Sequence, residues 1–320
     1  MLLWLALAGS TALAGAPPQL VFPSSAELVR VIVSVTDPAG RPIRGLKSTD
    51  FTVTEDGKKR QVATAVACAD FADEASPECS VDLVLLLDTS GSMRLILDNA
   101  RDAAEQFIEQ VPAAHARSIV AFDSRIRAMP IGDKTPAAVL DEALGKGAGG
   151  GTRLFDAIFL GLRRFSTDAA RRPIMVAVTD GEDTSDKPMG GGRRGGRYGG
   201  LAALSSRRDD APHRSLKDTA RALQLAGVTF YGISFARRVG NGQATLQSMA
   251  TATGGLIVDG EATDLKGQFN RIREDAATQY VLGFVPGASA VGKTHNLKVT
   301  VASAGSTVRH RLMYETRSRH

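Results

Sequence analysis

Short apolar runs and amphipathic segments alternate along the chain from Val81 to about residue 278. The apolar runs, such as residues 81–87 and 174–179, end abruptly in polar clusters, a pattern typical of strands buried on both faces in a parallel sheet. Between such runs, apolar residues recur at helical spacing, as they do in residues 96–111. This alternation requires a doubly wound, mostly parallel sheet with helices on both faces, so the sequence predicts an α/β fold.

Strand patterns without helices flank this α/β region on both sides. Residues 26–67 contain alternating apolar runs joined by turn signals, among them Asp56-Gly57, and residues 279–316 contain three further runs. Neither segment has enough strands to be stable alone, because isolated hairpins are marginal in water. We therefore expect both segments to form one small β-sandwich, with residues 81–278 inserted between them as the α/β domain.

Hard oxygen donors follow the first apolar run of the α/β domain. Asp88, Ser90 and Ser92 offer one carboxylate and two hydroxyls at alternate positions, and Gly91 between the serines lets the backbone turn tightly. Any polar turn contains similar residues, so this loop alone is also compatible with a turn that binds nothing. As a metal site, it would suit Mg²⁺, Mn²⁺ or Ca²⁺ better than zinc, because Cys and His are absent from it.

Two later stretches place further donors directly after structural breaks. Thr152 follows three glycines and precedes an amphipathic run, and Asp180 follows the second apolar strand pattern. The carboxyl ends of strands in an open α/β sheet form ligand crevices, so we expect these donors to meet the first group. The predicted metal ligands are Asp88, Ser90, Ser92, Thr152 and Asp180.

In chain order, these five donors resemble the metal-ion-dependent adhesion site (MIDAS) of von Willebrand factor type A (VWA) domains. The resemblance implies a Rossmann-like domain in which the hydroxyls of Ser90, Ser92 and Thr152 contact a magnesium-class cation and the carboxylates act directly or through water. It also implies that an acidic side chain of a protein partner completes the coordination. The order of β segment, α/β domain and β segment is similar to that of a group of exported bacterial proteins.

The N-terminus predicts export. Residues 1–14 form an apolar run that closes in small residues and is too short to span a membrane, as in a signal peptide cut after Ala14, although it lacks a Lys or Arg. We expect an exported protein, periplasmic or extracellular, without a stable membrane span. In an oxidising compartment the two cysteines, Cys68 and Cys79, favour a disulfide, and two free buried thiols are the alternative.

The basic charge of the chain is concentrated in one segment. Residues 187–217 hold eight Lys or Arg against two Asp, which gives this segment a charge of +6. The whole chain has a net charge of +5, so the rest of the chain sums to −1. A nucleic-acid-binding fold is therefore not indicated. The Gly/Arg-rich part, residues 187–214, predicts a disordered insert in the α/β domain, with an acidic partner as the functional alternative.

Motifs of catalysis are absent or incomplete. Residues 145–151 are rich in glycine but lack the lysine of a phosphate-binding loop, and Ser234 lies in a strand pattern without the final glycine of a nucleophile elbow. The histidines, without ligand spacing, are His115, His213, His295, His310 and His320. The sequence thus predicts no catalytic residue, and the protein is not expected to be an enzyme.

The leading functional interpretation is an exported, non-enzymatic adhesion module that captures a carboxylate of a protein ligand through a divalent cation. One alternative is a scaffolding component of an envelope assembly whose metal is structural, and another is a hydrolase that uses the cation to activate water. The resemblance further implies that the last helix of the domain, residues 264–278, moves when affinity changes. The alternative is a rigid helix that only packs against the sheet.

Overall fold

A computed structural model describes residues 28–70, 76–112, 115–145, 149–166, 170–184, 214–236 and 241–316. The predicted signal peptide and residues 187–213 of the Gly/Arg-rich insert lie outside these residues, so both remain predictions. In the part of the chain that the structure describes, no helix has the length and apolar character needed to cross a bilayer.

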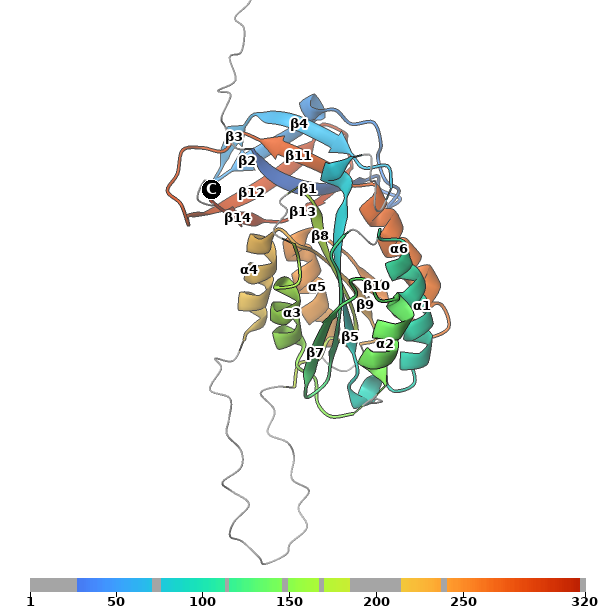
Figure 1. Ribbon diagram of the computed structural model, residues 1–320. Coiled ribbons are helices and arrows are strands. Elements are labelled where there is room, and N and C mark those ends of the chain that lie inside the picture. Colours follow the sequence, from blue (N-terminus) through green and yellow to red (C-terminus); the bar gives the residue numbers. More distant parts are fainter. Residues whose placement is uncertain are drawn as a thin grey trace, which may run out of the picture.

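A six-stranded sheet forms the centre of the molecule, in the order β10-β9-β8-β5-β6-β7 (Figure 1). All pairs are parallel except β6 with β7, so the predicted doubly wound, mostly parallel sheet is confirmed. Every residue of the central strand β5 is buried, as its apolar sequence predicted. The strands are β5 (Val81–Asp88), β6 (Arg117–Phe122), β7 (Ile126–Pro130), β8 (Arg172–Thr179), β9 (Thr229–Ser234) and β10 (Ile257–Asp259).

Helices cover both faces of this sheet, and the alternating side chains of β5 pack on both sets. Leu83, Leu85 and Leu87 belong to the core under the first set, whereas Val84 and Leu86 belong to the core under the second. The first set is α1 (Leu97–Glu109), α2 (Pro136–Leu144) and α6 (Leu265–Ala277). The second set is α3 (Leu154–Leu162), α4 (Leu216–Ala226) and α5 (Gly242–Thr253).

Two four-stranded antiparallel sheets lie at one end of the α/β layer, and each of them combines strands from both ends of the chain (Figure 1). Their apolar faces share one core, so the flanking segments form the predicted small β-sandwich. One sheet is β13 (Thr307–His310), β1 (Val29–Thr36), β11 (Tyr280–Phe284) and β4 (Val62–Ala67). The other is β14 (Met313–Glu315), β12 (Thr294–Val301), β2 (Phe51–Glu55) and β3 (Lys58–Arg60).

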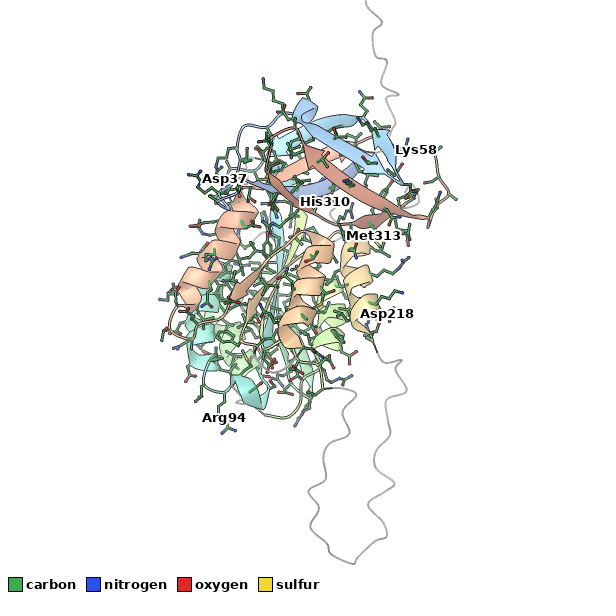
Figure 2. All side chains as sticks on the ribbon, turned by 180° about the vertical axis from the view of Figure 1, so that it is seen from behind. Asp37, Lys58, Arg94, Asp218, His310 and Met313 are labelled. Carbon is green, nitrogen blue, oxygen red and sulfur yellow. A yellow bond between two sulfur atoms is a disulfide. The ribbon has the colours of Figure 1, made fainter. Side chains whose placement is uncertain are left out.

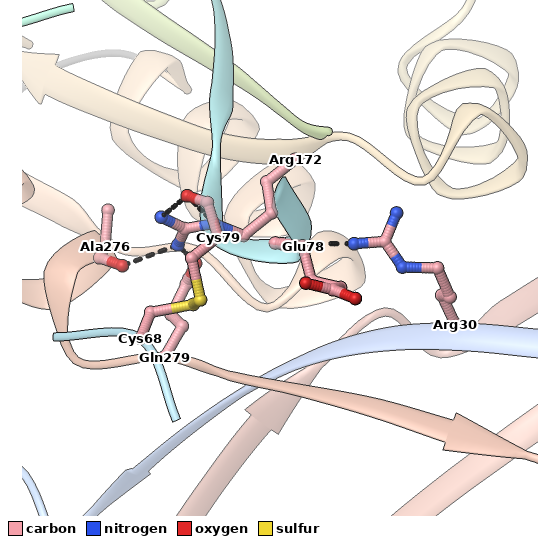
Figure 3. The surroundings of a disulfide bond; sticks show 7 residues. All are labelled: Arg30, Cys68, Glu78, Cys79, Arg172, Ala276 and Gln279. Atoms are coloured by element: carbon pink, nitrogen blue, oxygen red, sulfur yellow. Dashed lines mark hydrogen bonds between the residues drawn. A yellow bond between two sulfur atoms is a disulfide. The ribbon is translucent and has the colours of Figure 1, made fainter. Parts of the chain in front are cut away.

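A buried polar junction connects the sandwich with the α/β layer (Figure 3). The predicted disulfide is present there, with the Cα atoms of Cys68 and Cys79 5.5 Å apart. Arg172, which is 1% exposed, donates two hydrogen bonds to the carbonyl of Cys79, at 2.6 and 3.0 Å. It also donates to the carbonyl of Ala276, in the last turn of α6, at 2.6 Å and to Oε1 of Gln279 at 2.9 Å. One guanidinium therefore ties the start of β8, the disulfide, the end of α6 and the residue before β11 together.

Candidate metal centre

Four of the five predicted donors lie at the carboxyl ends of β5 and β8, which are adjacent in the sheet, and Thr152 lies in the loop before α3. After β5 the chain makes a 3-10 turn over Gly91–Met93, and this turn brings the Ser90 and Ser92 hydroxyl oxygens to 3.1 Å from each other. The Ser92 hydroxyl donates a hydrogen bond of 2.7 Å to Oδ2 of Asp180, which directly follows β8. Ser90, Ser92 and Asp180 thus form a continuous hydrogen-bonded chain, although Ser92 and Asp180 are 88 positions apart in the sequence.

Asp88 lies beneath this chain and is almost completely buried, with 1% exposure. Its Oδ1 accepts a hydrogen bond from the Ser90 amide at 2.8 Å, and its Oδ2 accepts one from the Thr179 hydroxyl at 2.6 Å. Burial raises the pKa of Asp88 to about 6, the hydrogen bonds from Ser90 and Thr179 oppose this shift, and the charge of Asp180 adds to it. The two carboxylates thus repel each other in a partly desolvated site.

Thr179 was missed by the sequence analysis. It is the last residue of β8 and fully buried, and its hydroxyl also accepts a hydrogen bond from the Gly181 amide at 3.0 Å. It therefore fixes both the Asp88 carboxylate and the turn that carries Asp180. The sequence did contain a signal for this role, because Thr179 carries a hydroxyl at the end of an apolar strand and directly precedes the predicted ligand Asp180.

Thr152 is held in place by a different set of contacts. Its amide donates to the Thr184 hydroxyl at 2.7 Å, and the Thr184 amide donates to the Thr152 carbonyl at 2.9 Å. These bonds tie the loop before α3 to the loop after Asp180. Among the described residues, the Thr152 side chain makes no hydrogen bond to the other four predicted donors. Hydrogen bonds therefore join four of the five donors, and Thr152 is tied only to Thr184, four residues after Asp180.

The residue types at this centre fit a hard divalent cation. Asp88 and Asp180 supply carboxylate oxygens, and the serines supply neutral hydroxyl oxygens, a set that Mg²⁺, Mn²⁺ and Ca²⁺ accept. No cluster of three or more His, Cys, Asp or Glu suited to a metal occurs in the described ranges, and a centre built mainly from hydroxyls does not form such a cluster. A cation would relieve the repulsion between the two carboxylates, which the hydrogen bonds only partly offset.

Comparison with known protein families decides what this domain is. Residues 83–182, which include the predicted donors, match the family model of the von Willebrand factor type A domain. The chain contains a VWA domain. The match begins in β5 and ends in the loop after Asp180, so it covers the part of the VWA domain that carries the candidate metal centre. A comparison with curated proteins finds no match.

Several solved structures are similar to this chain at low sequence identity. An aerotolerance-related membrane protein from Bacteroides fragilis is 14% identical, with 62% of this chain and 98% of that chain covered and a TM-score of 0.44. A von Willebrand factor type A protein from Catenulispora acidiphila is 15% identical, with 92% and 76% covered and a TM-score of 0.45.

A third similar structure is proximal thread matrix protein 1 from the mussel byssus, with a zinc-occupied MIDAS motif. It is 13% identical, with 70% of this chain covered and a TM-score of 0.46, and the present chain spans 50% of its length. These TM-scores are all below 0.5, so we draw no functional conclusion from the three structures.

Proposed function

We propose that the VWA domain binds a divalent cation, Mg²⁺ in the first instance, and uses it to capture a carboxylate of a protein ligand. The observation that carries this proposal is the hydrogen-bonded chain of Ser90, Ser92 and Asp180 above the buried carboxylate of Asp88. The residues that would hold the cation are Asp88, Ser90, Ser92, Thr152 and Asp180.

The donor set explains why a bound cation would attract an acidic partner. Three of the five proposed donors are neutral hydroxyls, so only Asp88 and Asp180 would offset the charge of the cation, and its open position would still attract a further anionic ligand. A bound Mg²⁺ also keeps positions that water fills and that a carboxylate can take. Ser92 lies on the exposed side of the centre, whereas Asp88 is buried, so the open side of the centre faces solvent. We therefore propose that the VWA domain binds a ligand and does not catalyse a reaction.

We place this function outside the cytoplasm, in the periplasm or the extracellular medium. The disulfide between Cys68 and Cys79 supports this placement, because structural disulfides persist in oxidising compartments. The protein is thus proposed as an exported adhesion module, with residues 81–278 as its binding domain and the sandwich as its support. The basic residues 187–217 remain a proposed contact for an acidic partner.

The metal centre is tested by calorimetry with Mg²⁺ on the wild type and on Ser90→Ala. The variant removes one hydroxyl from the centre, and we expect its affinity for Mg²⁺ to fall on the order of ten- to a hundred-fold. Ser124→Ala is the matched control, because Ser124 is exposed in the neighbouring turn between β6 and β7 and is not a predicted donor. Equal affinity in the wild type and Ser90→Ala would show that the ligand assignment is wrong.

Removal of the metal separates adhesion from a structural role. Immobilised protein should retain acidic protein ligands in Mg²⁺ and release them in EDTA, and Asp88→Ala should retain none in either buffer. A purely structural metal predicts the reverse pattern, in which EDTA lowers the melting temperature while the retained fraction of the folded protein stays the same.

A further inference from the structure

A second cluster of reactive side chains lies in the β-sandwich, far from the metal centre. Asp56 follows β2 and precedes β3, His295 lies in β12, and Ser289 lies in the segment between β11 and β12. Oδ2 of Asp56 is 2.8 Å from Nδ1 of His295, and Oγ of Ser289 is 3.0 Å from Nε2 of the same ring. The order of carboxylate, imidazole and hydroxyl is that of a nucleophilic triad.

The imidazole of His295 is held in one orientation. The residue is 3% exposed, and its ring stacks on the ring of Tyr314 with centroids 5.2 Å apart. Oδ1 of Asp56 accepts a hydrogen bond from the Asn296 amide at 2.9 Å, which fixes the carboxylate against the ring. This bond, together with the one from His295, lowers the pKa of Asp56 and keeps the carboxylate ionised. An ionised Asp56 can only accept this hydrogen bond, so in the neutral ring Nδ1 carries the proton and the lone pair of Nε2 points towards the hydroxyls.

Two hydroxyls share this lone pair. Oγ1 of Thr316 is 3.1 Å from Nε2 of His295, 2.9 Å from Oγ of Ser289 and 3.3 Å from the Lys293 carbonyl. When Thr316 donates to the Lys293 carbonyl, the proton of Ser289 is the one that Nε2 accepts. Thr316 is joined to the backbone on both sides, because its amide donates to the Lys293 carbonyl at 2.9 Å and its carbonyl accepts from the Gly292 amide at 2.7 Å. Ser289 is the less constrained hydroxyl, since its hydrogen bonds are made by the side chain alone.

We propose that Ser289 is a nucleophile, that His295 is its general base, and that the sandwich hydrolyses carboxylic esters at this triad. Oγ of Ser289 forms a bond with the ester carbonyl carbon while its proton moves to Nε2 of His295. The bond from that carbon to the leaving oxygen breaks, and the leaving alcohol takes the proton from Nε2. Water then attacks the acyl-serine, passes a proton through Nε2 back to Ser289, and releases the carboxylic acid. Asp56 is a positioning residue that holds the ring.

The surroundings of Ser289 allow an ester to approach. Ser289 is half-buried, and the next residues, Ala290 and Val291, are exposed. The amide of the residue after a nucleophilic serine often stabilises the oxyanion. No group in the described ranges accepts a hydrogen bond from the Ala290 amide, which leaves this donor to the substrate. Val291, with 65% exposure, offers an apolar surface to the acyl or the alcohol part of the ester.

The sequence analysis did not pair these residues, because Asp56 and His295 are 239 positions apart. The triad also lies at the opposite end of the molecule from the metal centre: Lys58, two residues after Asp56, and Arg94, two residues after Ser92, mark the two ends in Figure 2. The activity should therefore be independent of the cation.

The test uses the full chain in EDTA with two probes, a fluorophosphonate and p-nitrophenyl acetate. We expect the fluorophosphonate to modify Ser289, as located by mass spectrometry of the peptides, and p-nitrophenyl acetate to give a burst of nitrophenol. Ser289→Ala should abolish both signals, whereas Ser303→Ala, which removes an exposed serine of the same domain, should change neither. Mg²⁺ in place of EDTA should leave both rates unchanged.

Variants of the partners separate catalysis from a structural role. Asp56→Asn should lower the labelling rate at least ten-fold without a matching fall in melting temperature. His295→Gln should lose labelling, but its result counts only if the variant folds. A wild type that shows no adduct at Ser289, or an Asp56→Asn variant that labels at the wild-type rate, would overturn the proposal.

Discussion

Asp88→Asn will stabilise the metal-free protein by roughly 3 kcal/mol at pH 8 and remove its stabilisation by Mg²⁺. The buried carboxylate has a pKa of about 6 instead of 3.8, so ionising it in the folded state costs free energy, at about 1.4 kcal/mol for each pKa unit. Asparagine pays no such cost, and its carbonyl can accept the hydrogen bond that the Ser90 amide donates to Asp88. The measurement is urea denaturation in EDTA and in Mg²⁺.

The sign of the pH dependence follows from a raised pKa. Between about pH 4 and 6, the folded wild type binds more protons at Asp88 than the unfolded chain does, so its stability falls as the pH rises through this range. The difference between the variant and the wild type in EDTA should therefore be large at pH 8 and small at pH 4. Mg²⁺ should reverse the order at pH 8, because the ionised Asp88 is then a ligand.

Asp82→Asn is the matched control, since Asp82 lies in the same strand and is also buried, with 2% exposure. Its carboxylate accepts hydrogen bonds from Ser166 and Ala116 and pairs with Arg171 at 3.2 Å. Replacing it should lower stability at pH 8, in EDTA and in Mg²⁺ alike. An Asp88→Asn variant that is less stable than the wild type in EDTA at pH 8 would show that the ionised Asp88 carboxylate does not destabilise the metal-free fold.

Arg172→Met will destabilise the protein by about 3 to 5 kcal/mol, the largest loss expected from a single change at the junction. Methionine fills similar space, but it leaves the buried carbonyls of Cys79 and Ala276 and the Oε1 of Gln279 without their donor. Each buried acceptor that loses its partner costs about 1 to 3 kcal/mol. The free energy of unfolding from denaturant titration measures the effect.

The control for Arg172 is an arginine whose ion pair is exposed. Arg41 pairs with Asp37 at 2.8 Å, and its side chain is 80% exposed, so Arg41→Met should cost at most about 1 kcal/mol. A matched Mg²⁺ titration of Arg172→Met shows whether the junction also acts on the metal centre. An Arg172→Met variant as stable as the wild type would mean that the junction does not hold the two parts together.

Local patterns were sufficient to predict the layers of the fold. The apolar run before Asp88 predicted a strand buried on both faces, and the strand deficit of the two flanking segments predicted that they share a sandwich, because both properties depend on neighbours in the sequence. Cys68 and Cys79 were paired correctly because the chain has no other cysteine. The exact limits of the domains, the signal peptide and the Gly/Arg-rich insert stay predictions.

Contacts between distant residues could not be predicted. Nothing in the sequence around Arg172 indicates that its guanidinium reaches Cys79, 93 positions earlier, and Gln279, 107 positions later. The roles of Thr179 and of His295 likewise depend on partners that only the folded chain brings near. At the metal centre, the types of donor were predicted from the loops, but the buried state of Asp88 and the backbone attachment of Thr152 required the packing of β5 against β8 and of one loop against another.

The pairing of N-terminal with C-terminal strands in the sandwich determines the order in which the chain can fold. β1 pairs with β11 and β13, β4 pairs with β11, and β2 pairs with β12, so β1, β4 and one edge of β2 lack their partners until the segment after the VWA domain is synthesised. Until then their backbone donors and acceptors are open edges, which other chains can pair with. The sandwich is therefore completed last: a chain interrupted after α6 can complete its central sheet and still expose unpaired strand edges in its N-terminal segment.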